Sequence, residues 1–160
     1  MNKFDVLYDI LLQQLKLYES FLILENKKYD VIINDNVEDL DKIVSEEQVF
    51  FLKSRGLDLK REDILKQLGM ANKTLLEVVS LIDENEKHRF KEMHAKIYKV
   101  LADFKEKNTQ CQELTQIRLH RVKTIINKLE ESKSQSKQYF KDGNKGEVDI
   151  NKVNLISKKI

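Results

Sequence analysis

The 160-residue sequence contains no proline, no tryptophan and only 4 glycines, and it has a single cysteine, Cys111. Proline and glycine interrupt helices more strongly than any other residue, so their scarcity favours long helices over sheets. One cysteine excludes an intramolecular disulfide and suits a reducing cytosol. These absences predict an all-α protein with a cytoplasmic localisation.

Long apolar runs are absent as well. No stretch of 18 apolar residues occurs, so we expect no membrane insertion. Asp5 and Asp9 lie within the first apolar run, which argues against a signal peptide. The chain does contain 35% charged residues beside 41% apolar ones, and the apolar residues are periodic. This combination is typical of a thin helical bundle and not of a disordered chain.

The first half of the chain shows two helical patterns separated by a short turn. Apolar residues spaced alternately by four and three predict a helix from about 3 to 33, with Glu25 as the one polar residue on that face. After the turn, Asn36 is the expected N-cap of a second helix from about 37 to 68, which stops at Gly69. Two helices of nearly equal length joined by a short turn predict an antiparallel hairpin.

The second helix carries two overlapping apolar stripes, one of which includes Val44 and Phe51. A broad apolar face of this kind predicts a helix packed between two neighbours. Further on, Thr74 and Glu77 form a capping-box pattern that opens a short helix from about 75 to 82.

The remaining pattern is a helix from about 87 to 140 with no breaker inside it. The fold predicted is an elongated antiparallel helical hairpin plus a short helix plus one long C-terminal helix, in a coiled-coil-like three-helix bundle. Residues 1–140 form the predicted helical domain, and 141–160 a mobile C-terminal tail. One face of the long helix recurs at heptad spacing; it includes Phe90, His94, Ile97, Leu101, Phe104, Asn108, Cys111, Val122, Ile125 and Leu129.

The predicted helices differ in length, and this difference points to a binding surface. Each hairpin helix spans roughly 48 Å, so the long helix should reach the hairpin turn near Leu119 and leave about 20 residues, ~30 Å, beyond it. Those residues hold Val122, Ile125, Ile126 and Leu129. Exposed apolar surface of this extent marks a partner site. Pairing of two copies through the same residues, or a bend that folds the helix back, are the alternatives.

Nucleic acid is a weaker candidate partner. The 29 basic and 27 acidic residues nearly balance, whereas nucleic-acid-binding proteins usually have a clustered basic face. Lysines do follow one side of the long helix, but Glu130 and Glu131 interrupt them and no aromatic residues alternate with them for stacking. We therefore expect no nucleic acid as a ligand.

Residues that usually carry chemistry are few. His88, His94 and His120 lack the spacing of known metal motifs, and Cys111 has no neighbouring cysteine or histidine. Cys111 is thus expected to be a small buried side chain. The sequence predicts no metal site, no cofactor and no enzyme activity.

Three polar residues interrupt the apolar faces of the hairpin. Glu25 and Glu47 stand at similar distances from the turn, so they should approach each other, and Arg61 should lie near Leu11. Such residues usually fix the register of a bundle at some cost in stability. We expect Lys28, its neighbour Lys27 or a residue of the long helix to neutralise the two carboxylates.

Taken together, the residues of the chain resemble the FlgN family of flagellar export chaperones. The resemblance covers nearly the whole chain and rests on Leu22, Leu24, Lys27, Lys28, Val37, Leu40, Ile43, Val44, Glu47, Arg61, Gly69, Thr74, Glu77, Asn108, Leu114, Tyr139 and Gly143. The chain departs from the family at two points. Cys111 stands where the family usually has a second Asn, and Gly56 interrupts a run that is usually leucine-rich. A glycine inside a helix costs about 1 kcal/mol.

The resemblance implies a cytosolic, helical protein without enzyme activity. It implies that the partners are the C-terminal helices of the hook–filament junction proteins FlgK and FlgL, which the chaperone presents to the export gate component FlhA. We expect the client to contact four apolar residues in the last part of the long helix, Val122, Ile125, Ile126 and Leu129. Tyr139 is expected to contact the gate. The alternative function is a structural coiled-coil protein that forms a homodimer through the same face.

Overall fold

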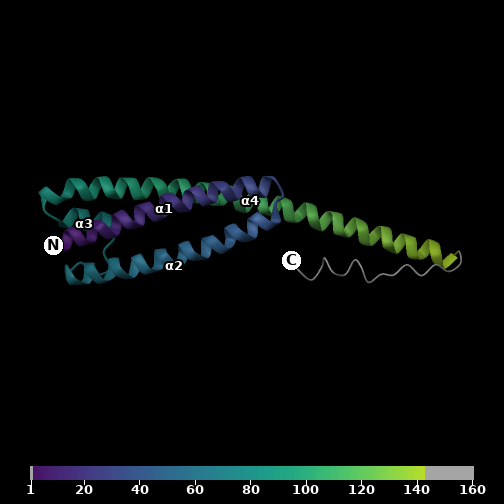
Figure 1. The fold of residues 1–160 in the computed structure, drawn as a ribbon, viewed down its shortest axis with the longest axis horizontal. Coiled ribbons are helices and arrows are strands. Elements are labelled where there is room, and N and C mark those ends of the chain that lie inside the picture. Colours follow the sequence, from purple (N-terminus) through teal and green to yellow (C-terminus); the bar gives the residue numbers. More distant parts are fainter. Residues whose placement is uncertain (1, 143–160) are drawn as a thin grey trace. The chain divides into compact units, whose positions relative to one another are not determined.

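The computed structural model describes residues 2–142, with side chains as far as residue 138. Four α-helices follow one another: α1 Lys3–Ile33, α2 Val37–Gln67, α3 Leu75–Leu81 and α4 Glu84–Asp142 (Figure 1). The described residues contain no strand, which confirms the predicted all-α fold. No helix end differs from its predicted position by more than three residues.

The chain divides into two compact units, Met1–Gln116 and Ile117–Ile160. The first unit contains α1, α2, α3 and the beginning of α4, and the second contains the rest of α4. Of the predicted C-terminal tail, 141–142 belong to α4 and 143–160 lie outside the described residues. The domain boundary after residue 140 therefore stays a prediction.

Local side-chain chemistry sets the helix ends as the sequence predicts. Asn36 caps α2, since its side-chain oxygen accepts a hydrogen bond of 3.1 Å from the Asp39 backbone N–H. Gly69 ends that helix with a φ of 74°, a conformation that glycine adopts without strain. Thr74 and Glu77 form the predicted reciprocal capping box at the start of α3. The turn-forming residues thus fold the first unit back on itself.

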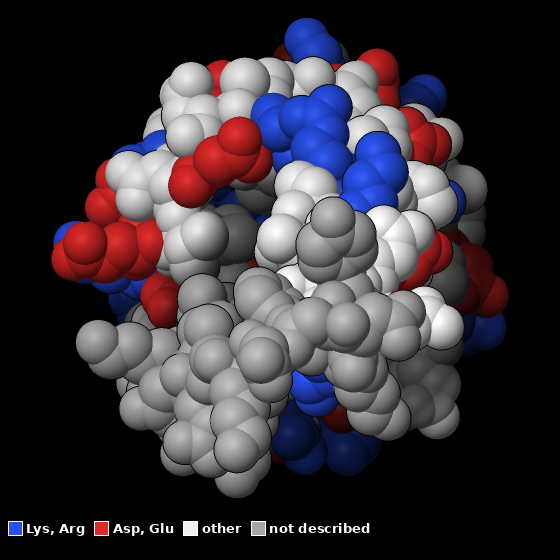
Figure 2. Space-filling model, turned by 90° about the vertical axis from the view of Figure 1, so that its right-hand side faces the viewer, with Lys and Arg blue, Asp and Glu red and all other residues white. Residues whose placement is uncertain are grey.

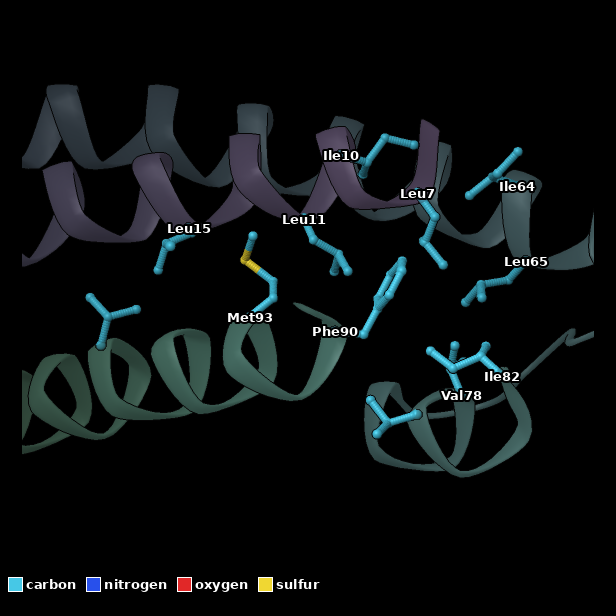
Figure 3. Packing of buried hydrophobic residues seen from close by; sticks show 12 residues of the cluster. Leu7, Ile10, Leu11, Leu15, Ile64, Leu65, Val78, Ile82, Phe90 and Met93 are labelled. Carbon is cyan, nitrogen blue, oxygen red and sulfur yellow. The ribbon is translucent and has the colours of Figure 1, made fainter. Parts of the chain in front are cut away.

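The main core of the first unit lies where all four helices meet. Phe90 of α4 is fully buried there, and the rings of Phe4 and Tyr8 pack edge-on against it with centroids 6.3 and 5.7 Å away. The labelled side chains in Figure 3 come from α1, α2, α4 and the α3 region and point toward one another. The buried members of this cluster are Leu7, Ile10, Leu11, Leu15, Ile64, Leu65, Val78, Val79, Ile82, Phe90, Met93 and Val100.

A second cluster of aromatic rings joins the same helices nearer the hairpin turn. Phe21 of α1 stacks on Phe50 of α2 with centroids 5.0 Å apart, and Phe104 of α4 lies 4.5 Å from the same ring. Leu24 and Ile43 complete this buried group. Each ring contact adds to the apolar burial that holds α4 beside the hairpin.

Within the first unit, α4 runs in the same direction as α1 and opposite to α2. Arg89 donates a 2.8 Å hydrogen bond to Asp5, and Asn108 donates one of 3.0 Å to Glu25. These pairs are 84 and 83 residues apart, so the register between α1 and α4 is nearly constant. The long helix therefore runs from the open end of the hairpin toward its turn, as the expected arrival near Leu119 requires.

The helix packed between two neighbours is α1, not α2, so this prediction is wrong. Nine residues of α1 are buried, whereas α2 buries Ile43, Glu47, Ile64 and Leu65. Val44 and Phe51, assigned to the broad buried face of α2, are exposed. The cause is tertiary: α4 packs along α1, which buries a second face of α1 and leaves the corresponding face of α2 in solvent.

The buried face of α4 also differs by one residue from the predicted one at two positions. Met93 and Val100 are buried, whereas His94 is half-buried and Leu101 is 39% exposed. Residues 90, 93, 97, 100 and 104 repeat at heptad spacing just as 90, 94, 97, 101 and 104 do, so spacing alone could not decide between the two series. The prediction of Leu101 as a buried face residue is wrong, whereas His94 is half-buried, as Ile97 is.

Candidate functional site

The side chains of α4 change from buried to exposed along its length. As far as Cys111, inward-facing residues are buried in the two core clusters or against α1. From 112 to 138, where the described side chains end, none is buried. The change falls close to Ile117, the first residue of the second unit.

The four predicted contact residues lie in this exposed part of α4. We call Val122, Ile125, Ile126 and Leu129 the distal seam; their side chains are between 41% and 55% exposed. Spacings of three and four residues place them on one side of the helix. They therefore form a continuous apolar strip with about half of each side chain in water.

The register of the first unit accounts for the position of this strip. Hydrogen bonds between α1 and α4 join residues 83 to 86 positions apart, and α1 ends at Ile33. By the same register, α1 has no residue left to pair with positions after about Leu119. The helix lengths predicted from the sequence lead to the same position.

Charged residues border the distal seam unequally. The segment 117–138 contains six basic residues and two acidic ones: Arg118, Arg121, Lys123, Lys128, Lys133 and Lys137 against Glu130 and Glu131. Basic and acidic side chains are nevertheless interspersed among uncharged ones over the described residues visible in Figure 2. A helix that carries acidic residues beside its apolar face would complement this segment.

A cluster of polar side chains lies between the three long helices of the first unit. Glu25 is fully buried, and Lys28 places its Nζ 2.8 Å from Glu47 and 3.8 Å from Glu25. Asn108 of α4 donates its hydrogen bond to Glu25 from the other side. The prediction that Glu25 and Glu47 approach each other is confirmed, and of the expected partners Lys28 supplies the positive charge, whereas Asn108 adds a hydrogen bond but no charge.

The environment of this cluster shifts its protonation equilibria. Burial raises the pKa of Glu47, and the nearby Glu25 raises it further, although the hydrogen bond from Lys28 acts in the opposite direction. Burial opposes the charge on Lys28, but its bonds to Glu47 and Glu25 raise its pKa overall. Burial beside Glu25 raises the pKa of the Cys111 thiol to about 12. These groups bond to one another across helices, which favours one register of the bundle.

The other predicted residues take the following positions. Arg61 lies 3.8 Å from Asp58, whose carboxylate accepts a hydrogen bond from Gln14, one helical turn from Leu11. Cys111 is buried as expected, and its Sγ lies 3.6 Å from the backbone oxygen of Glu25. The side chain of Tyr139 lies outside the described residues.

The described residues offer neither a metal centre nor a membrane-spanning helix. No group of three or more His, Cys, Asp or Glu side chains is arranged to hold a metal ion in the part of the chain that is described. Within the same part, no helix combines the length and the apolar character needed to cross a bilayer.

The chain matches a known protein family. The family model described as FlgN protein matches residues 1–147. The chain belongs to the FlgN family. No curated protein and no solved structure matches it significantly. Membership gives the chain the general role of a flagellar export chaperone, in a family of chaperones and not of enzymes.

Sequence reasoning missed some residues that hold this FlgN-family bundle together. Gln14 is buried and donates a 2.7 Å hydrogen bond to Asp58, yet its position was not assigned to the core. The partnership of Asn108 with Glu25 was expected only as some residue of the long helix. The sequence did contain one indication that Gln14 is buried, because it directly precedes Leu15 on the apolar face of the helix.

Proposed function

We propose that the chain is a cytoplasmic export chaperone that binds the C-terminal helices of the hook–filament junction proteins FlgK and FlgL. The observation that supports this most directly is the distal seam, a strip of four half-exposed apolar side chains on one side of α4. A partner helix would lay its own apolar face along the strip, which is a common mode of peptide recognition.

The energetics favour an occupant for this strip. Apolar surface left in water costs roughly 25 cal/mol for each Å². The four residues do not take part in either core cluster of the first unit, so their burial by a partner would add stability without disturbing that core. The excess of basic residues in 117–138 supports a client helix whose flanks are acidic.

The test replaces apolar seam residues by charged ones. The double variant Ile125→Glu/Leu129→Glu should abolish binding to the C-terminal segment of a junction protein, measured by isothermal titration calorimetry. Helix content and the melting temperature should stay unchanged, because these residues lie outside the buried core. The matched control Ile23→Glu/Leu76→Glu changes the same residue types at exposed positions of α1 and α3 and should bind normally.

The opposite results would refute the proposal. Normal client binding by the seam variant would show that the distal seam is not the binding surface. Unfolding of the same variant would show that the seam belongs to the core of the chain. If the seam variant instead converts a stable homodimer to a monomer and neither protein binds the client, the alternative function as a structural coiled-coil protein is supported.

We assign presentation of the client to the gate component FlhA to Tyr139, near the end of α4. Tyr139→Ala should weaken binding to the cytoplasmic domain of FlhA in a pull-down experiment. The same variant should bind a junction protein with unchanged affinity, because Tyr139 lies ten residues beyond the seam. Tyr98→Ala, at an exposed position in the first part of α4, is the matched control.

A further inference from the structure

A second exposed apolar strip lies on α2, in the first unit and apart from the distal seam. We call it the α2 stripe, and its side chains are between 40% and 71% exposed. At 100° per residue its members fall within about 100° of the helix circumference, on a side that the buried residues of α2 do not share. The members are Val37, Val44, Phe51, Leu52 and Leu59.

Three polar residues lie within this stripe: Asp41, Gln48 and Arg55. All three are exposed, and neither Asp41 nor Arg55 forms an ion pair within residues 2–138, the part whose side chains are described. One acid near the start of the stripe and one base near its end make it complementary to a copy of itself in the reverse direction.

The order of the residues selects one register for such a pair. If two α2 helices pack antiparallel with Gln48 opposite Gln48, then Val37 faces Leu59 and Val44 faces Leu52. The same register places Asp41 of one copy opposite Arg55 of the other, twice by symmetry. A shift that centres the pair between Phe51 and Leu52 would instead oppose Asp41 and Glu62, and a parallel pair would oppose identical charges, so both are disfavoured.

We propose that the chain forms a two-fold symmetric homodimer in which the α2 stripes of two copies pack antiparallel, centred on Gln48. The stripe explains why α2, with few buried residues, retains exposed apolar side chains, of which Phe51 also packs edge-on against Phe21 of α1. The α2 stripe and the distal seam share no residue, so this inference does not depend on the client proposed above.

The first experiment measures the molar mass of the full chain by light scattering over a series of concentrations. The mass should rise from 18.9 kDa toward twice that value as the concentration increases. Leu52→Glu should raise the dissociation constant at least about tenfold, since it places a charge in the centre of the apolar contact. Ile125→Glu, the matched change on the distal seam, should leave the dimer intact.

Three outcomes of this experiment would overturn the proposal. They are a monomer at every concentration, a dimer that Ile125→Glu disrupts while Leu52→Glu does not, and a Leu52→Glu variant that loses client binding while its mass is unchanged. The last outcome would assign the α2 stripe to the client. Circular dichroism should show the same helix content for all variants, because both residues are exposed.

A charge exchange tests the register itself. Asp41→Arg and Arg55→Asp should each weaken the dimer, and the double variant should restore it, because the proposed pair places these residues opposite each other. A double variant that is no better than either single one would refute the Gln48-centred register. In a Cys111→Ser background, Gln48→Cys should also form a disulfide-linked dimer with glutathione disulfide as oxidant, whereas Glu46→Cys, on another side of α2, should not.

Discussion

Lys28 donates a 2.8 Å hydrogen bond to Glu47 across the α1–α2 hairpin, beside the fully buried Glu25. One lysine thus serves two carboxylates, and the pKa of Glu47 is raised, mainly by burial and then by Glu25. The folded state therefore holds a proton on Glu47 more tightly than the unfolded chain does. This contribution to stability is complete below the ordinary pKa of about 4.5 and is lost as the pH rises through the raised value.

Glu47→Gln should remove this pH dependence, because the amide resembles the protonated carboxyl. At pH 8 we expect the variant to be more stable than the native chain by up to about 1 kcal/mol. Near pH 4 the two proteins should be equally stable. Urea unfolding at both pH values measures the difference.

Glu46→Gln is the matched control for that experiment, since Glu46 is the neighbouring and exposed carboxylate. It should change the stability by less than about 0.5 kcal/mol at either pH. A Glu47→Gln variant that is less stable than the native chain at pH 8 would mean that the bond from Lys28 outweighs the burial of a second carboxylate.

Much of the fold could be predicted because it depends on short-range chemistry. Asn36, Gly69 and Thr74 act within a few residues of themselves, so their roles follow from the sequence alone. The approach of Glu25 and Glu47 could also be predicted, because a short turn fixes which residues of a hairpin face each other.

Which helix occupies the centre could not be predicted from periodicity. Phe51 follows a heptad as regularly as Ile43 does, yet Phe51 is exposed and Ile43 is buried. The difference depends on the side of the hairpin that α4 packs against, a property of tertiary packing and not of one helix. The distal seam could be predicted because it depends on helix lengths, which the breakers in the sequence determine.

Gly56 and Gly69 should respond in opposite ways to replacement by alanine. Gly56 lies inside α2, and a Cβ added there would meet no atom within 4 Å, so Gly56→Ala should stabilise the chain by about 1 kcal/mol. Gly69 has a positive φ, which costs a residue with a side chain roughly 1–2 kcal/mol, so Gly69→Ala should destabilise it. Thermal unfolding of both variants measures the two signs, and a destabilised Gly56→Ala would contradict the open space found around Gly56.

Cys111 should be chemically inert in the folded chain. Its side chain is buried, and burial raises its pKa to about 12, so almost no thiolate exists at pH 8. Ellman's reagent should react with it only after unfolding in urea. A cysteine introduced at the exposed Ser132 in a Cys111→Ser background should react at once, and rapid reaction of native Cys111 would show that α1 and α4 separate readily.

Phe90 should contribute more to stability than any exposed aromatic residue of the chain. It is fully buried where α1, α2, α3 and α4 meet, and its ring touches those of Phe4 and Tyr8. Phe90→Ala should therefore cost about 3–5 kcal/mol, through lost burial and the cavity that remains. Tyr98→Ala removes an aromatic ring from α4 at a position that is 69% exposed and should cost less than about 1 kcal/mol. Urea unfolding monitored by circular dichroism compares the two, and equal losses would mean that α4 is not anchored through Phe90.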